Sequence, residues 1–179
     1  MEDRRGHELT DDEDRRRDPL GRIVTDLLYQ PFLEKLNALI LACQARGAIY
    51  VATSGLRTYA EQDNLYAQGR TAPGKRVTNA RGGYSPHNFG VAADFAPHVG
   101  GDYEGKLKTD YAVRNYAVLG EETAKLNLEW GGRWLKIKDT PHVQLPLKTR
   151  GITWEMMRTW YADGGLVEVY DRLDLLGGW

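Results

Sequence analysis

The segment Ser85-Pro86-His87-Asn88-Phe89-Gly90-Val91-Ala92-Ala93-Asp94 places a histidine and an aspartate seven residues apart, where a long loop gives way to an apolar run. Its proline and its central glycine disfavour a helix. The apolar residues from Val91 to Phe95 predict a short strand instead. A loop that turns into a strand in this way can bring the side chains of His87 and Asp94 to one point.

The chain before this segment predicts two helices and a strand. Apolar residues recur every three or four positions over residues 31–46, and a glycine follows, which is typical of an amphipathic helix with a glycine stop. Residues 48–53 form a β-type run. Thr58 and Glu61 form a capping-box signature for a second helix. It leads into a long loop over residues 69–86, which glycines and prolines punctuate.

The chain after the segment predicts further short elements. We expect a helix over residues 110–128, and two strands over residues 134–137 and 142–145 joined by a turn. A helix over residues 153–162 should end at a glycine pair, with a short helical piece after it. Short strands thus lie among helices without a regular alternation of strand and helix. This favours an α+β fold over a doubly wound α/β fold.

The length and the distribution of charge predict one folded domain behind a charged arm. The chain has 179 residues, of which 41% are hydrophobic and 27% charged, as in an ordinary globular protein. From Met1 to Asp18, thirteen of eighteen residues are charged, which leaves too little apolar surface to offset the entropy of ordering. We expect a flexible arm over residues 1–24 and a single domain over residues 25–179.

The composition argues against several classes of protein. The net charge is −1, with 24 basic and 25 acidic residues, so a nucleic-acid partner is not expected. No apolar run approaches the roughly 20 residues of a membrane span, and the charged N-terminus lacks the apolar stretch of a Sec-type signal peptide. The single cysteine, Cys43, excludes an internal disulfide and predicts a buried packing residue. We expect a monomer without membrane insertion.

Two of the four histidines suit a metal site together with Asp94. His87 and His142 with one carboxylate form the ligand set that catalytic zinc uses when its fourth position stays open. Taken singly, each of these side chains is also common as a hydrogen-bonded structural group, so the residues alone leave both interpretations open. His98, four residues after Asp94, is a competing ligand candidate that we interpret as a neighbouring loop residue.

Several ordered motifs resemble one group of enzymes. Ser85-x-His87-x-x-Gly90-x-Ala92-x-Asp94, followed by Asp139-x-x-His142, is similar to the zinc peptidases of the D-alanyl-D-alanine carboxypeptidase and dipeptidase superfamily. The chain resembles the L-alanyl-D-glutamate endopeptidase branch, which includes phage endolysins, more closely through further motifs: Leu65-Tyr66-Ala67-Gln68-Gly69-Arg70-Thr71, Val77-Thr78-Asn79-Ala80, Trp130-Gly131-Gly132-x-Trp134, Asp139-x-Pro141-His142 and Gly164-Gly165-Leu166. The resemblance covers about residues 25–170.

The resemblance implies an α+β fold of the Hedgehog and D,D-peptidase type, in which helices flank a small central antiparallel sheet that carries the zinc site. It implies one Zn²⁺ per chain, held by His87, Asp94 and His142. Asp139 would be the general base and acid. Its Asp-x-Pro-His form looks like the endopeptidase branch, whereas the related carboxypeptidases usually carry glutamate at that position.

Four further residues would act on the substrate side. The resemblance implies that Arg57 polarises the scissile carbonyl or holds the oxyanion. It implies that Ser85 lines the substrate site and that Trp130 and Trp134 shape the cleft. Apart from the resemblance, the ordinary structural interpretations are a turn residue at Asp139, a surface cation, a loop-capping serine and packing tryptophans.

The expected activity is that of a zinc-dependent peptidoglycan endopeptidase that cleaves the L-alanyl-D-glutamate bond of cell-wall stem peptides, as a phage endolysin does. The alternatives are a D-alanyl-D-alanine carboxypeptidase of the same superfamily and a zinc-bearing binding module without activity. The expected partner is the stem peptide of bacterial peptidoglycan. The protein would be made in the host cytoplasm and act on the wall, in the periplasm where the host has an outer membrane.

Overall fold

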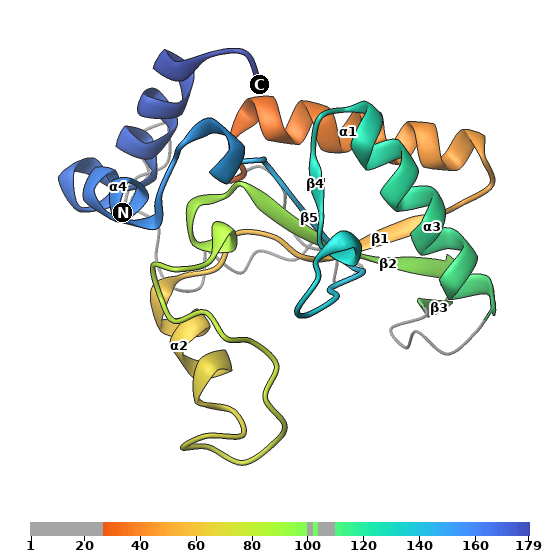
Figure 1. Cartoon of the computed structure of the whole chain (residues 1–179), viewed down its shortest axis with the longest axis horizontal. Helices are drawn as coiled ribbons and strands as arrows, with labels where there is room; N and C mark the ends of the chain where they lie inside the picture. Colours follow the sequence, from red (N-terminus) through yellow and green to blue (C-terminus); the bar gives the residue numbers. More distant parts are fainter. Residues whose placement is uncertain (1–26, 100–101, 104–109) are drawn as a thin grey trace.

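The computed structural model describes residues 27–99, 102–103 and 110–179, drawn in colour in Figure 1. The predicted arm over residues 1–24 lies outside the described residues. The helices are α1 (Gln30–Ala45), α2 (Tyr59–Ala67), α3 (Asp110–Lys125) and α4 (Trp154–Leu176), with single 3-10 turns at η2 (Pro86–Phe89), η3 (Gly131–Arg133) and η4 (Lys148–Arg150). The strands are β1 (Tyr50–Ser54), β2 (Ala92–Val99), β3 (Asp102–Tyr103), β4 (Glu129–Trp130) and β5 (His142–Gln144).

One antiparallel sheet forms the centre of the fold. Its strands lie in the order β1-β2-β5-β4, and β3 pairs with β2. Strand β2 carries Asp94 and strand β5 carries His142, and these two strands are neighbours. Helices lie around the sheet in Figure 1. The α+β class with a small central antiparallel sheet is therefore confirmed.

Helices α1 and α3 contact each other and share one buried core with the sheet (Figure 1). Phe32 of α1, Leu119 of α3 and Val143 of β5 are fully buried in it. The Tyr116 hydroxyl donates a hydrogen bond to the carbonyl oxygen of Phe95 at 3.1 Å, which ties α3 to β2. The core thus supports the two strands on which the site is built.

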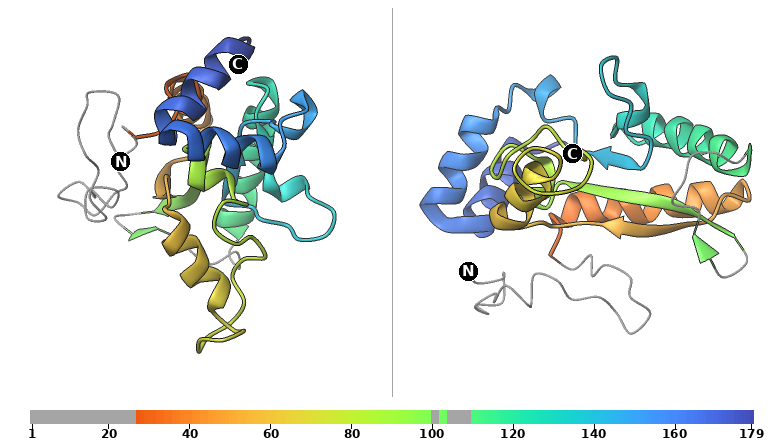
Figure 2. Two further views of the ribbon diagram at one scale, coloured as in Figure 1. Left: turned by 90° about the vertical axis from the view of Figure 1, so that its left-hand side faces the viewer. Right: turned by 90° about the horizontal axis from the view of Figure 1, so that it is seen from below.

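Helix α2 and the loop after it extend away from this core (Figures 1 and 2). The predicted capping box is present at the start of the helix. The Thr58 hydroxyl accepts a hydrogen bond from the Glu61 N–H at 3.2 Å, and the Glu61 carboxylate accepts one from the Thr58 N–H at 3.0 Å. This reciprocal pair explains why the helix begins directly after Thr58.

One predicted strand was wrong. Residues 134–137 form an irregular loop, and the partner of β5 on this side is β4, which lies just before the Gly131-Gly132 pair. The alternating apolar residues of the loop imitate a strand in sequence, but Leu135 is 100% exposed and Ile137 is 58% exposed. Their side chains therefore do not face a core, and the short strand ends where the two glycines turn the chain.

Other predictions are confirmed with shifted boundaries. Strand β2 continues beyond Phe95 to Val99. The expected end of the last helix at the glycine pair is confirmed by non-helical dihedral angles at Gly164 and Gly165, after which a second helical segment of α4 continues to Leu176. Cys43 is fully buried, and burial, followed by the charge of nearby acidic Glu122, raises its pKa to about 11. Of the helices in the described ranges, none combines the length and apolar character needed to cross a membrane.

Trp130 packs its indole ring directly against the backbone of two glycines. A Cβ atom on Gly120 of α3 would lie 2.3 Å from the ring, and one on Gly132 would lie 2.2 Å from it. The indole Nε1 donates a hydrogen bond to the carbonyl oxygen of Thr140 at 2.7 Å. Trp130 therefore joins α3 to the segment that leads into β5.

We expect Gly120→Ala to lower the free energy of unfolding by about 1–3 kcal/mol, the usual cost of overpacking a core. At an exposed helical position the same change would stabilise the protein by up to about 1 kcal/mol, so the sign of the effect reports the contact with Trp130. Urea unfolding followed by circular dichroism measures it. A Gly120→Ala protein as stable as the original, or an equal cost in a Trp130→Leu background, would contradict this packing.

Candidate metal centre and active-site cleft

His87 reaches the site from the single turn η2. Pro86 starts the turn with a fixed φ and without an N–H to satisfy, and Gly90 ends it in the left-handed region with a φ of 65°. A Cβ atom on Gly90 would also lie 2.0 Å from the hydroxyl of Tyr170, so a larger residue would have to displace that hydroxyl. The turn leaves His87 buried beside the first residues of β2.

Asp94 and His142 lie opposite each other on the central pair of strands. The two residues are Cα partners in the antiparallel ladder of β2 and β5. Directly paired residues project their side chains from the same face of a sheet. Oδ1 of Asp94 accordingly lies 3.0 Å from Nδ1 of His142. The register of one strand pair thus brings two of the three predicted ligands together.

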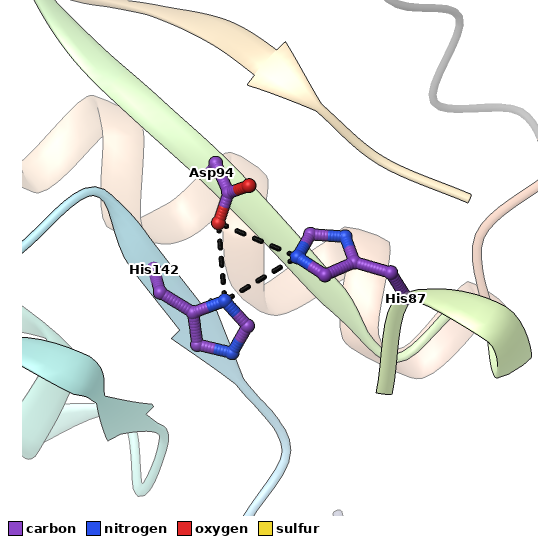
Figure 3. Close-up of side chains that lie close together, drawn as sticks. All are labelled: His87, Asp94 and His142. Carbon is purple, nitrogen blue, oxygen red and sulfur yellow. Dashed lines mark hydrogen bonds and ion pairs between the residues drawn. The ribbon is translucent and has the colours of Figure 1, made fainter. Parts of the chain in front are cut away.

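The third predicted ligand completes a compact cluster (Figure 3). Nε2 of His87 lies 3.4 Å from Oδ1 of Asp94 and 3.3 Å from Nδ1 of His142. The three side chains come from η2, β2 and β5, and they could share one metal ion. His98 lies further along β2, paired with Tyr103, so it sits on a strand rather than in a loop and is outside this cluster.

A hydrogen bond behind His87 fixes the orientation and the tautomer of its ring. Nδ1 lies 2.7 Å from the carbonyl oxygen of Gly55. A carbonyl oxygen can only accept, so Nδ1 carries a proton, and Nε2 is the ring atom that can bind a cation beside Asp94. Nε2 of His87 and Oδ1 of Asp94 lie 3.4 Å apart, close enough for both atoms to bind one cation.

The electrostatics of the cluster also suit a cation. Burial works to raise the pKa of Asp94, but the charges of the two histidines and their hydrogen bonds outweigh burial and hold that pKa far below its usual value. Burial likewise works to lower the pKa of His142, and hydrogen bonds with Asp94 and Gln144 raise it above its usual value. Asp94 therefore stays ionised although its side chain is only 21% exposed, and an anion so far removed from water needs a positive partner.

Arg57 holds a guanidinium beside the second oxygen of Asp94. Its Nη2 lies 3.9 Å from Oδ2 of Asp94 and donates a hydrogen bond to the hydroxyl of Ser54 at 2.6 Å. Its Nη1 donates to Oε1 of Gln62 at 2.7 Å, and Gln62 is fully buried. Burial lowers the pKa of Arg57, but an arginine remains a cation at neutral pH. The group is thus a fixed positive charge at the edge of the cluster.

Asp139 lies on the turn that leads into β5. Its N–H donates to the carbonyl oxygen of Gly131 at 3.0 Å, and its own carbonyl oxygen accepts from the N–H of His142 at 3.3 Å. Burial, followed by the charge of Asp94, raises the pKa of Asp139. A partly buried carboxylate with a raised pKa beside such a cluster is suited to take up and release a proton.

A cleft of about 820 Å³ opens over the cluster. Three of the predicted substrate-side residues, Arg57, Ser85 and Trp134, line it. Trp130 is not among the described residues that line the cleft, because its ring packs inward against α3. A second groove of about 630 Å³ adjoins the cleft at Trp134 and Asp139.

Three amide side chains at the site had no predicted role. Asn88 donates to the carbonyl oxygen of Arg57 at 2.8 Å and so joins η2 to the segment after β1. Gln62 orients the guanidinium of Arg57. Gln144 contacts the ring of His142. Only Gln144 carries a usable sequence signal, because residues two apart on a strand share one face.

Comparisons with known proteins agree on one family. A family profile described as D-alanyl-D-alanine carboxypeptidase matches residues 78–145, a range that contains the whole cluster. Over 119 residues the chain is 38% identical to the peptidoglycan L-alanyl-D-glutamate endopeptidase CwlK of Bacillus subtilis (strain 168). The alignment covers 63% of this chain and 70% of that relative.

The matches among solved structures include two peptidases. VanYB in complex with D-alanine-D-alanine matches with a TM-score of 0.50 and 17% identity, over 80% of this chain and 87% of that chain. The L-Ala D-Glu endopeptidase ChiX of Serratia marcescens matches with a TM-score of 0.49 and 21% identity, over 69% of this chain and 84% of that chain. The VanYB match, at 17% identity, shows similarity of fold alone. On the strength of its identity to CwlK across more than two thirds of that protein, the chain belongs to the D-alanyl-D-alanine carboxypeptidase and dipeptidase superfamily of zinc peptidases.

Proposed function

We propose that the protein is a zinc-dependent peptidoglycan endopeptidase that cleaves the L-alanyl-D-glutamate bond of cell-wall stem peptides. The observation that carries the proposal is the cluster of His87, Asp94 and His142 in a cleft that Asp139 and Arg57 also line. Membership of a zinc peptidase family supports the metal. The 38% identity to an endopeptidase named for this bond supports the substrate.

The spacing of the three ligand atoms fits zinc. Atoms that bind a tetrahedral zinc ion lie about 2.0–2.2 Å from it, which places them about 3.3–3.6 Å from one another. Two of the separations in the cluster, 3.3 and 3.4 Å, lie in this range, and the third, between Asp94 and His142, is shorter at 3.0 Å. Two imidazoles and one carboxylate also leave a fourth position open, as in catalytic zinc sites. We therefore assign one Zn²⁺ per chain to His87, Asp94 and His142.

The residues around the cluster have complementary roles in the proposed hydrolysis. When bound, zinc lowers the pKa of water at its open position to about 7 and polarises the scissile carbonyl. Asp139 takes the proton of the attacking water and passes it to the leaving amine of D-glutamate. Its raised pKa suits this role, because the same carboxyl group must hold the proton before donating it.

Arg57 stabilises the negative charge that develops on the carbonyl oxygen. Its guanidinium is held in advance by Ser54 and Gln62, so it needs little reorganisation as the charge forms. Ser85 and Trp134 line the cleft and are assigned to hold the stem peptide. No covalent intermediate with the protein is required.

A D-alanyl-D-alanine carboxypeptidase is the second candidate, because the matching family profile carries that description. The endopeptidase is preferred for the identity to CwlK and for the aspartate at position 139 in place of glutamate. A zinc-bearing binding module without activity is disfavoured, because Asp139 and Arg57 line the cleft beside the cluster. The product of the reaction distinguishes all three.

We further propose that the protein is a phage endolysin that acts as a monomer on the wall of its host, in the periplasm where an outer membrane is present. The likeness of its motifs to endolysins of this branch supports the proposal. The catalytic domain would span residues 25–179, behind a flexible charged arm over residues 1–24. Lysis of permeabilised cells, included in the first experiment below, tests the lytic role.

With zinc, the purified protein is expected to cut defined muropeptides so that new D-glutamate amino termini appear, and to clear suspensions of cells whose outer membrane has been permeabilised. Mass spectrometry of the products identifies the bond. Release of single D-alanine residues would identify the carboxypeptidase instead, and wall binding without any product would favour the binding module. A chelator should stop the reaction, and cleavage that continues after complete metal stripping would refute the metal mechanism.

Asp139→Asn is expected to keep zinc and lose turnover. Removing a general base typically slows a reaction by about 10²–10⁴-fold, so kcat should fall within that range while KM and the zinc content of the protein stay close to their original values. Steady-state kinetics on muropeptides and elemental analysis measure the two effects. Full activity in Asp139→Asn would show that the base has been assigned wrongly.

Zinc is expected to raise the melting temperature of the metal-free protein. An ion at 100 times its dissociation constant that binds only the folded chain stabilises it by about 2.7 kcal/mol. Asp94→Asn keeps the shape of the side chain and removes its charge, so the shift should shrink. Circular dichroism melts measure it, with Asp171→Asn on the exposed surface of α4 as the matched control. Equal shifts in Asp94→Asn and Asp171→Asn would contradict the assignment.

A further inference from the structure

We infer that Gln144, Glu129 and Trp134 form a hydrogen-bonded relay that orients His142 for metal binding, which makes Gln144 and Glu129 positioning residues of the zinc site. The inference rests on the proposed function, because it takes His142 as a zinc ligand. It adds a support for the metal that neither the motifs nor the comparisons indicate.

The pairing of β4 with β5 places Glu129 and Gln144 side by side across the sheet. Gln144 follows His142 by two positions on β5, so both side chains leave the same face. Glu129 on β4 is the Cα partner of Gln144. Oε1 of Gln144 lies 2.9 Å from Nε2 of His142, and Nε2 of Gln144 donates to Oε2 of Glu129 at 3.1 Å. At the far end, Nε1 of Trp134 donates to Oε1 of Glu129 at 2.6 Å.

The hydrogen bond from Trp134 to Glu129 determines which group donates in each of the other hydrogen bonds of the relay. An indole N–H can only donate and a carboxylate accepts, so one oxygen of Glu129 receives Trp134 and the other receives the NH₂ group of Gln144. The carbonyl end of the Gln144 amide must then face His142, where it can only accept. Nε2 of His142 therefore carries a proton, and Nδ1 is the ring atom turned towards Asp94 and His87.

Burial makes the relay difficult to replace with water. His142 is 4% exposed and Gln144 is 8% exposed. The ring of Trp134 lies 5.1 Å from the imidazole ring of His142, centroid to centroid, at 47°, and it lines the cleft. Hydrogen bonds shielded in this way are stronger than exposed ones, and their members polarise one another.

In both imidazoles of the cluster, the ring nitrogen that faces away from the other ligands makes a hydrogen bond, but the two acceptors differ. His87 donates to a backbone carbonyl, that of Gly55. A ligating histidine more often donates directly to a carboxylate, a backbone carbonyl or a water. In this protein the Gln144 amide lies between His142 and the Glu129 carboxylate. Because the carboxylate accepts from the NH₂ group of Gln144, the amide oxygen faces His142 and accepts from it.

The first test measures zinc affinity of the full-length protein by competition with a chromogenic chelator. Gln144→Leu should raise the zinc dissociation constant about 10–100-fold, the usual effect of losing such a support. Trp134→Phe keeps an aromatic ring beside His142 but removes the indole N–H, so it should weaken zinc binding in the same direction and by less. Gln44→Leu, on the exposed surface of α1, is the matched control and should change nothing.

The decisive variant exchanges the amide and the carboxylate. In Glu129→Gln with Gln144→Glu, the new glutamate accepts from His142 and from the new glutamine, whose oxygen accepts from Trp134. Every hydrogen bond is rebuilt, so zinc affinity should return towards that of the original protein. Glu129→Gln alone should stay weakened, because nothing then fixes the direction in which the Gln144 amide faces.

Nuclear magnetic resonance of the zinc-loaded protein gives a readout independent of affinity and activity. A slowly exchanging N–H proton on Nε2 of His142 should appear in the original protein and in the exchanged variant. It should be lost in Gln144→Leu, where the proton meets no acceptor.

Unchanged zinc affinity in a folded Gln144→Leu protein would overturn the relay, as would an exchanged variant that folds but binds zinc as weakly as Gln144→Leu. If Gln144→Leu does not fold, Trp134→Phe provides the test instead. Unchanged zinc affinity in Trp134→Phe would then overturn the relay. An original protein that binds no zinc would refute the proposed function itself. Zinc binding that none of these substitutions alters would refute the relay alone.

Discussion

The antiparallel pairing of β2 with β5 is the contact on which the candidate site depends. It places Asp94 directly opposite His142. A slip of one residue in this ladder would turn one of the two side chains to the other face of the sheet. The buried core under the strands supports this register. The third ligand, His87, needs only the turn η2 at the start of β2 to complete the cluster.

A cluster of this kind is costly unless its parts are fixed. Two imidazole nitrogens and a carboxylate oxygen lie within 3.0–3.4 Å of one another, and Asp94 stays ionised although it is largely enclosed. Contacts behind the ligands keep them in place: the carbonyl of Gly55 for His87 and the amide of Gln144 for His142. A divalent cation at this point would bind all three atoms, in place of the hydrogen bonds among them.

Much of the fold and of the candidate site could be predicted from the sequence. The features that could not be predicted have one physical reason in common. The loop-to-strand transition at His87 and Asp94 and the capping box at Thr58 are local patterns, and both are present. The α+β class follows from the order of such elements. The strand expected over residues 134–137 failed, because alternating apolar residues also occur in exposed loops and only tertiary packing separates the two cases.

The roles of single side chains depend on register and packing between distant segments, which one sequence does not reveal. The cleft-side position expected for Trp130 is an example, since its ring is instead packed against Gly120. Glu129 is another, because it reaches the site only through its pairing with Gln144. The three predicted ligands and Asp139 do line one cleft. The ordered motifs could predict this because their spacing reflects a whole fold, whereas local periodicity predicts only single helices and strands.

The coordination of zinc in the loaded protein tests the central claim most directly. A crystal structure of the zinc-bound protein, with the metal located from its anomalous scattering, should place one ion between Nε2 of His87, Oδ1 of Asp94 and Nδ1 of His142. Each distance should be about 2.0–2.2 Å, and one position should be left open towards the cleft. An ion bound elsewhere, or an ion held by fewer than these three side chains at full zinc occupancy, would contradict the account.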